Sequence, residues 1–183
     1  MCGIIGITSN KEVTSRIVNS LKKLEYRGYD SAGIATLKEG FIQEVKCEGR
    51  VEKLEQNISK SGLKGNIGIG HVRWATHGKP STINAHPHSS EKVSVVHNGI
   101  IENSTILKKV LEKKGYVFKS ETDTEVIAHL VTDYLKKNNL KNTIIKVLKK
   151  LHGSFALGII FEDQPDLLVG ARRGSPLAVG YGP

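Results

Sequence analysis

The spacing of apolar residues along the chain switches between the two-residue period of strands and the three-to-four-residue period of helices. Residues 11–25 carry an apolar stripe at helical spacing, formed by Val13, Ile17, Val18, Leu21 and Leu24. Two β-rich runs flank Lys38-Glu39-Gly40 in the pattern of a hairpin. Taken along the whole chain, the pattern predicts strands at 4–8, 32–37, 41–45, 67–74, 93–96, 154–161, 167–171 and 177–180, and helices at 11–25, 50–58, 104–113, 122–135 and 142–151.

Two of the predicted helices carry signals for their ends. Asn103 is the expected N-cap of the helix at 104–113, and Gly115 is placed to end it. Thr122 followed by Glu125 matches a capping box, which predicts that the next helix opens at Thr122. Many strands joined as hairpins, with helices grouped in pairs, favour antiparallel sheets covered by helices over a parallel βαβ fold. The predicted fold class is therefore α+β.

Residues 75–90 interrupt this alternation. The segment has no periodicity and is rich in Pro, Ser, Thr and His. Long irregular loops inside compact domains are usually functional. We therefore expect this loop to contribute to a site.

Length and composition are those of a globular protein. A chain of 183 residues with 38% hydrophobic and 25% charged residues is long enough for one domain with a buried core. The longest apolar stretch, Phe155 to Phe161, is too short for a transmembrane helix. Lys11, Glu12 and Arg16 stand where a secretory signal would be apolar. Two cysteines cannot form a disulfide framework, so we expect a cytoplasmic protein.

The net charge of +9 and the isoelectric point near 9.5 raise the question of nucleic-acid binding. Most of the basic residues are lysine pairs in or at the ends of helical segments, where solvated faces and helix C-termini place them. Aromatic residues make up 5% and do not interleave with the basic ones, so no stacking platform is evident. We predict neither a nucleic-acid nor a membrane partner.

The residue after the initiator methionine is the strongest candidate for chemistry. Removal of Met1 would leave Cys2 with a thiol and a free α-amine on the same residue. An α-amine has a pKa of about 7.7–8.0, so it can act as the general base for the thiol. From its position alone, the simpler interpretation is that Cys2 has no functional role. Other motifs decide between the two.

Five further motifs accompany the Cys2-Gly3-Ile4-Ile5-Gly6-Ile7 run. They are Tyr26–Gly33, His71–Gly78, Asn84–His88, His97–Asn103 and Glu121–Glu125. Together they resemble the class II, or N-terminal-nucleophile, glutamine amidotransferases, and in particular the glutaminase domains of the glutamine–fructose-6-phosphate aminotransferases. The resemblance covers residues 1–183 and implies a four-layer αββα sandwich with two antiparallel sheets between helices. Amidophosphoribosyltransferases share Cys2 and His97-Asn98-Gly99 but not the 26–33 run.

The resemblance implies that Cys2 attacks the side-chain amide of glutamine to form a thioester, releasing ammonia, and that water then frees glutamate. The other implied roles, in order, are an oxyanion hole at Asn98 and Gly99, recognition of the α-carbon end of glutamine by Arg73, Thr76, His77 and Asp123, and gating or support by Trp74 and Arg27. Three of these roles have an alternative from the residues alone: a hairpin turn for Asn98-Gly99, a helix-dipole contact for Asp123 and core packing for Trp74.

The resemblance implies no cofactor and no metal. The histidines at 71, 77, 86, 88 and 97 lack the Cys partner or helical His spacing of a zinc site. Expected partners are glutamine and a sugar-phosphate isomerase module, in the same or a separate chain, and a homodimer is left open. The alternative to an active enzyme is a non-catalytic remnant that only binds glutamine. We expect Cys47 to be a structural thiol.

Overall fold

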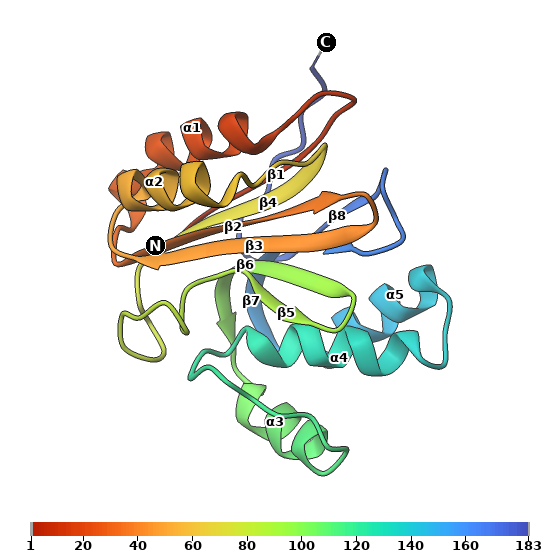
Figure 1. The fold of residues 1–183 in the computed structure, drawn as a ribbon. Coiled ribbons are helices and arrows are strands. Elements are labelled where there is room, and N and C mark those ends of the chain that lie inside the picture. The colour runs from red at the N-terminus through yellow and green to blue at the C-terminus, as the bar shows by residue number, and fades with distance from the viewer. Residues whose placement is uncertain (1, 183) are drawn as a thin grey trace.

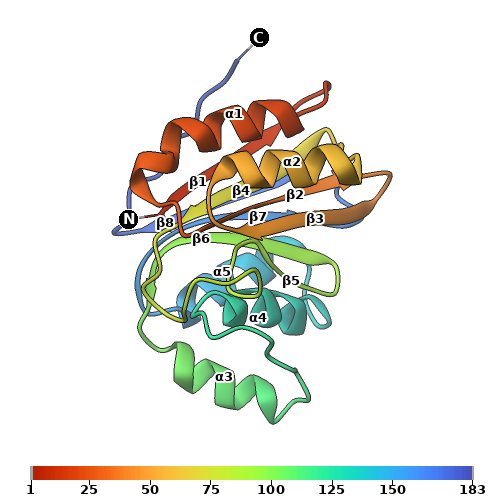
Figure 2. The same cartoon turned by 60° about the vertical axis from the view of Figure 1, so that its left-hand side comes forward.

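The computed structural model describes residues 2–182 and arranges them as two stacked antiparallel sheets between layers of helices (Figures 1 and 2). The first sheet has the strand order β1-β4-β2-β3 and contains β1 (Gly3–Thr8), β2 (Ser31–Lys38), β3 (Phe41–Glu48) and β4 (Ile67–Arg73). The second has the order β5-β6-β7-β8 and contains β5 (His88–Ser90), β6 (Val93–Ile101), β7 (Gly153–Phe161) and β8 (Leu168–Arg173). The predicted αββα arrangement is confirmed.

The helices divide between the two outer faces. Helices α1 (Thr14–Leu24) and α2 (Val51–Ser61) cover the first sheet, and the short helix η1 (Glu25–Arg27) follows α1 (Figure 1). Helices α4 (Glu125–Leu135) and α5 (Leu140–Lys150) cover the second sheet, and α3 (Ser104–Glu112) extends beyond it. The chain therefore completes the first sheet and the two helices that cover it before it begins the second sheet.

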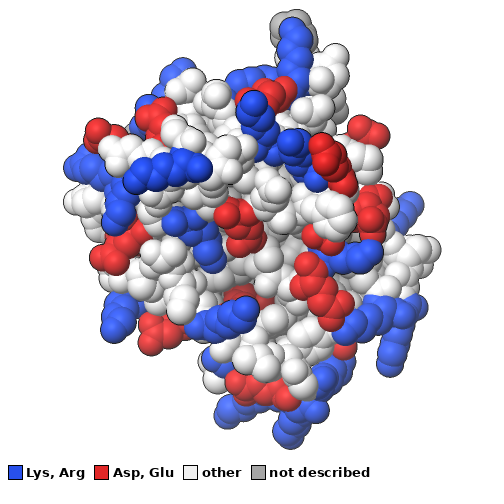
Figure 3. Space-filling view, viewed as in Figure 1, with Lys and Arg blue, Asp and Glu red and all other residues white. Residues whose placement is uncertain are grey.

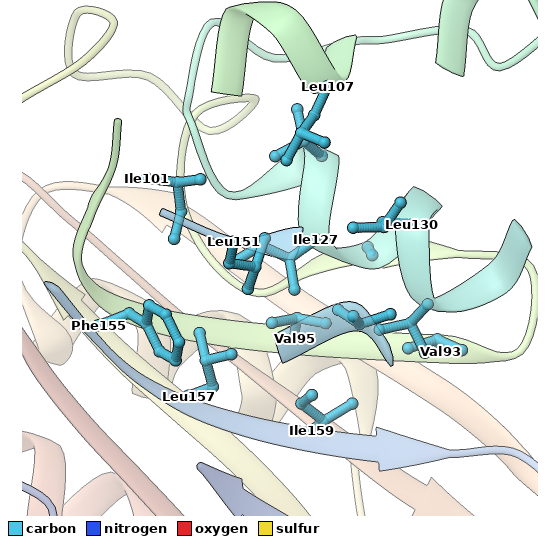
Figure 4. Close-up of a cluster of buried hydrophobic side chains, with 14 of the residues drawn as sticks. Val93, Val95, Ile101, Leu107, Ile127, Leu130, Leu151, Phe155, Leu157 and Ile159 are labelled. Atoms are coloured by element: carbon cyan, nitrogen blue, oxygen red, sulfur yellow. The ribbon is translucent and has the colours of Figure 1, made fainter. Parts of the chain in front are cut away.

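Three clusters of buried apolar side chains hold the layers together. One lies between the first sheet and α1 and α2, and a smaller one lies between the sheets, where Ile69 of β4 meets Val96 of β6 and Ile160 of β7. The largest joins the second sheet to α4 and α5, with Ile127 and Leu151 packed toward Val95 (Figure 4). Burial of apolar surface on both faces of the second sheet explains why β7 reads as a nearly continuous apolar run.

Most of the predicted elements are confirmed, with three corrections. No strand forms at 177–180 in the described part of the chain. Helix α4 begins three residues after Thr122, so the predicted capping box is wrong: the carboxylate of Glu125 instead accepts backbone N–H groups of Lys119 and Ser120. Asn103 occupies the N-cap position of α3, but its side chain bonds the backbone at 150 and 152 rather than the helix.

Basic and acidic residues are both spread over the face seen in Figure 3, and some of the basic ones lie at its lower edge, where α3 lies. Lys109, Lys113 and Lys114 are exposed in and after this helix. Among residues 2–182, no helix is long and apolar enough to cross a bilayer. The expected removal of Met1 concerns a position outside the described residues.

Candidate active site

The Cys2 thiol lies at the start of β1, beside the end of β4. Antiparallel pairing aligns Gly3 with Val72, which brings Cys2 next to the strand end that carries Arg73 and Trp74. Its Sγ atom donates to the carbonyl oxygen of Trp74 at 3.5 Å and accepts from the backbone N–H of Trp74 at 3.4 Å. Burial raises the pKa of the Cys2 thiol, and the Trp74 N–H and the Arg73 charge oppose that rise. The resting thiol is therefore protonated at neutral pH.

The Arg73 guanidinium is buried, at 3% exposure, within the loop that follows β4. It donates to the carbonyl oxygens of His77, of Gly78 at 2.9 Å and of Lys79 at 3.4 Å. A carboxylate oxygen of Asp30 lies 3.7 Å from it. A guanidinium has five N–H donors, so these contacts leave capacity for a ligand. The loop is therefore folded around a fixed, buried positive charge.

Asp30 contacts the loop after β4, and the sequence patterns did not single it out. Its carboxylate accepts the backbone N–H of Ala75 and the hydroxyl of Ser31, the latter at 2.9 Å, in addition to its approach to Arg73. The backbone at Gly28, two residues before Asp30, lies close to the backbone of Arg73. A side chain at Gly28 would meet the Arg73 carbonyl carbon at 2.5 Å. Asp30 thus fixes the direction in which the chain leaves β4. The feature of the sequence that could have indicated Asp30 is its place in the Tyr26–Gly33 motif.

Asp123 lies on the opposite wall, just before α4. It is buried, and its Oδ2 atom accepts the backbone N–H of Ile101 at 2.7 Å. Its Oδ1 atom lies 4.0 Å from Nδ1 of His97. Helix α4 begins only at Glu125, so Asp123 lies before the first turn of the helix and not within it. The Oδ2 atom is therefore held by the backbone, while Asp123 as a residue lines the pocket described below.

Asn98 and Gly99 lie inside β6 and pair with β7, so the alternative of a hairpin turn is wrong. Gly99 has a φ of 145°, and a side chain there would meet the carbonyl oxygen of Ser154 at 2.0 Å. Only glycine fits this combination of backbone angle and close approach. The position is therefore constrained by β7.

Four buried histidines lie between the sheets and the start of α4: His71, His86, His88 and His97. Two of them, His86 and His97, also line the pocket described below. His71 and His86 stack with ring centroids 4.1 Å apart, and His71 Nε2 donates to the backbone oxygen of His97 at 2.9 Å. The Thr124 hydroxyl contacts both His86 Nε2 at 2.7 Å and His97 Nδ1 at 2.9 Å. Burial lowers the pKa of His71 and of His88 to about 3 and that of His97 to about 4, so these rings are neutral at pH 7.

One pocket brings most of the predicted site residues together. Its lining contains Cys2, Arg73, Trp74, Thr76, His77, Gly99 and Asp123, together with Thr122, Thr124, His86 and His97. Asn98 and Arg27 are half-buried and do not line it. Among residues 2–182, no group of three or more His, Cys, Asp and Glu side chains is arranged to hold a metal ion. The pocket can present a nucleophile, a cation and an anion to one ligand.

Trp74 stands at the rim. Its side chain is 51% exposed, so the core-packing alternative is wrong. The ring meets Tyr29 edge-on with centroids 6.0 Å apart, and the Arg50 guanidinium lies over Tyr29. An aromatic pair therefore borders the entrance beside Cys2. Cys47, by contrast, is buried in β3, and burial raises the pKa of its thiol.

The chain is similar in sequence to known proteins. A family model described as a glutamine amidotransferase domain matches residues 72–180. The chain is 54% identical over 183 residues to a protein of Bradyrhizobium diazoefficiens and 56% identical over 182 residues to one of Clostridium acetobutylicum, both named glutamine–fructose-6-phosphate aminotransferase [isomerizing]. These matches cover 100% and 98% of the chain but 30% of each relative. The chain thus spans about 30% of the length of the curated relatives it matches.

Solved structures show the same architecture. The glutamine phosphoribosylpyrophosphate amidotransferase of B. subtilis, complexed with ADP and GMP, superposes with a TM-score of 0.74 at 32% identity, covering 88% of the chain and 35% of that structure. A glutamine aminotransferase class-II domain protein of Silicibacter pomeroyi superposes with a TM-score of 0.56 at 16% identity, covering 80% and 70%, and shares the fold.

Proposed function

Because the chain belongs to the glutamine amidotransferase family, we propose that it hydrolyses the side-chain amide of glutamine to glutamate and ammonia. The observation that carries the proposal is the single pocket lined by the Cys2 thiol, the Arg73 guanidinium and the Asp123 carboxylate. Glutamine has an amide at one end and an α-carboxylate and α-ammonium at the other. The three side chains match these groups in kind.

In the proposed reaction the Cys2 sulfur attacks the amide carbon of glutamine. The thiol proton passes to the α-amine of Cys2, which is free once Met1 is removed and which titrates near neutral pH. The C–N bond of the tetrahedral intermediate then breaks. The α-ammonium group of Cys2 returns its proton to the leaving nitrogen, which departs as ammonia. Water attacks the resulting thioester, which releases glutamate and restores the thiol. The raised pKa of the buried thiol is the reason a base is required.

Asn98 and Gly99 supply the proposed oxyanion hole. The side-chain amide of Asn98 and the backbone N–H of Gly99 are the donors for the oxygen that becomes negative during attack. A single donor of this kind is worth about 2.7–4 kcal/mol of barrier. The placement of Gly99 in the pocket lining supports this role, and the pairing of β6 with β7 keeps its backbone in place.

Arg73 and Asp123 bind the α-carbon end of glutamine in this proposal. The planar guanidinium suits the α-carboxylate, and the Oδ1 atom of Asp123 suits the α-ammonium. Thr76 and His77, both in the loop after β4, add hydrogen bonds to the same end. Arg27, in η1, supports the surroundings of the nucleophile.

For these residues acting with a sugar-phosphate isomerase module, in the same or a separate chain, we propose the activity for which the relatives are named. Ammonia from the pocket would be transferred to fructose-6-phosphate by a sugar-phosphate isomerase module, with residues 1–183 as the glutaminase domain and Trp74 as a gate between the two sites. The exposure of Trp74 at the rim beside Cys2 supports that position. We place the reaction in the cytoplasm.

The test compares two cysteine variants in preparations whose N-terminal Met1 is shown by intact mass to be removed. Cys2→Ala should abolish glutamate release while glutamine affinity, measured by calorimetry, stays within about threefold, because the thiol contacts only the reacting amide. The matched variant Cys47→Ala should keep its kcat, since Cys47 lies outside the pocket. Glutamate release by Cys2→Ala at the wild-type rate would overturn the proposal. Binding without turnover by the unmodified protein would favour the non-catalytic remnant.

A further inference from the structure

The Asn84 side chain bridges the two segments that carry the opposite charges of the pocket. It is 1% exposed, and its carboxamide makes three hydrogen bonds. The Nδ2 group donates to the carbonyl oxygen of Lys79 at 2.9 Å and to Oε2 of Glu121 at 3.0 Å. The Oδ1 atom accepts the backbone N–H of Glu121 at 2.9 Å. We call this arrangement the Asn84 bridge.

One end of the bridge reaches Arg73. The Lys79 carbonyl oxygen that accepts from Asn84 also accepts from the Arg73 guanidinium at 3.4 Å. Gly78, whose carbonyl is another acceptor of Arg73, packs directly on the bridge: a side chain there would approach Asn84 Nδ2 to 2.7 Å. The loop around the guanidinium is therefore seated on the Asn84 carboxamide.

The other end reaches Asp123. Glu121, which both donates to and accepts from Asn84, is separated from Asp123 by one residue. Asp123 is itself fixed to the backbone of Ile101. A shift of the segment around residue 121 relative to residue 79 would thus change the separation of the Asp123 carboxylate and the Arg73 guanidinium.

Asparagine is the side chain that this position requires. Its amide supplies two N–H donors and an acceptor, and the bridge uses both functions. An aspartate of the same shape would turn a second carboxylate oxygen toward Glu121 and the Lys79 carbonyl, where donors are needed. Buried groups that lose their partners are costly, so the surrounding loops would have to move.

We propose that Asn84 is a positioning residue that sets the spacing between Arg73 and Asp123 and thereby the recognition of the α-carboxylate and α-ammonium of the substrate. The inference rests on the proposed function, because it assumes that these two charges bind the α-carbon end of glutamine. Asn84 does not line the pocket, so it acts through the two loops and not by touching the substrate.

The experiment measures kcat and KM for glutamine in Asn84→Asp, in Asn84→Ser and in a double variant that combines Asn84→Asp with Glu121→Gln. Asn84→Asp should raise KM at least tenfold and change kcat less than threefold. Asn84→Ser, which introduces no charge, should raise KM in the same sense. In the double variant the new amide at position 121 can donate to the new carboxylate at position 84, which reverses the bond. Its KM should therefore recover at least threefold from that of Asn84→Asp.

Two controls separate positioning from general damage. The alkylation rate of Cys2 by iodoacetamide should stay within twofold of wild type in every variant, since the bridge does not touch the thiol. Asn138→Asp adds the same charge beyond the C-terminal end of α4 and should leave both kinetic constants unchanged.

A wild-type KM in the Asn84 variants, with or without a lower melting temperature, would overturn the positioning role while leaving the proposed function intact. A double variant with no recovery would also overturn it. An unmodified protein that neither binds nor hydrolyses glutamine would overturn the proposed function and this inference with it.

Discussion

Helices α1 and α4 have the same length and cover opposite faces of the sandwich, yet they are buried in different ways. In α1 one stripe is buried, formed by Thr14, Ile17, Val18 and Leu21, and the opposite face is polar and exposed. In α4 eight consecutive residues from Glu125 to Thr132 are buried, including a glutamate and a histidine. An amphipathic stripe only has to exclude water, whereas buried polar groups must find partners.

The partners of α4 come from the segments that form the site. Burial alone would raise the pKa of Glu125, but the His129 ring, 3.5 Å from its carboxylate, and hydrogen bonds from Lys119 and Ser120 lower that pKa to about 2. His129 Nδ1 bonds the hydroxyl of Ser90 at 2.8 Å. The first turns of α4 thus bond to the strand β5 and to Lys119 and Ser120 of the segment before the helix. We conclude that α1 is mainly a cover, and that α4 also positions the site.

The largest expected effect is a loss of stability in acid that originates in the buried histidine cluster between the two sheets and the start of α4. Unfolded histidines have a pKa of about 6.5, whereas His71 and His88 fold with values of about 3 and His97 with about 4. Their contribution is therefore complete above about pH 6.5 and is lost as the pH falls toward the folded values. Between those pKa values, each ring lowers the free energy of unfolding by about 1.4 kcal/mol for every unit by which the pH falls. Urea unfolding between about pH 7.5 and pH 4.5 measures the slope.

The histidine origin of this slope is tested by substitution. His88→Gln should flatten the pH dependence by about one ring's share, or about 1.4 kcal/mol per pH unit. His152→Gln, at an exposed position after α5, should not alter it. Equal slopes in both variants would show that the buried cluster is not the cause, and would weaken the contrast between the two sides.

A core substitution in α1 should affect stability without affecting recognition. Leu21 is fully buried on the inner face of α1, and Leu21→Ala should lower the free energy of unfolding by about 2–5 kcal/mol. Glutamine KM should stay within twofold, because α1 contributes no residue to the pocket lining. Val110→Ala, on the exposed face of α3, is the control and should cost less than about 0.5 kcal/mol. A tenfold rise in KM for Leu21→Ala would show that α1 is more than a cover.

The smallest effects come from one substitution made in both helices. The Thr132 hydroxyl of α4 donates to the carbonyl oxygen of Ser90 at 2.9 Å, whereas the buried Thr14 hydroxyl of α1 has no hydrogen-bond partner among the described residues. Thr132→Val should cost about 1–3 kcal/mol, and Thr14→Val should be neutral or slightly stabilising. Urea unfolding at neutral pH measures both, with Thr132→Ser as the variant that keeps the bond. Equal costs would contradict the proposed difference between the helices.

Much of this architecture was predictable from local pattern. The stripe of α1 and the hairpin of β2 and β3 follow from periodicity and turn residues within a few positions of one another. The helical stripe and the hairpin depend on neighbours along the chain, and so they are visible in the chain itself. The expectation that Cys2, Arg73 and Asp123 share a site came instead from the resemblance of their motifs to a known family, and one pocket brings the three together.

Partners distant in sequence were decided by the tertiary structure. The pattern at Thr122 and Glu125 suggested a capping box, but Thr122 bonds His88 and Glu125 turns back to Lys119 and Ser120. Asp123 reaches Ile101, 22 residues earlier, because packing of α4 on the second sheet brings them together. Periodicity specifies which face of an element is buried. It does not specify which donor meets which acceptor, because that depends on how the completed layers are placed against each other.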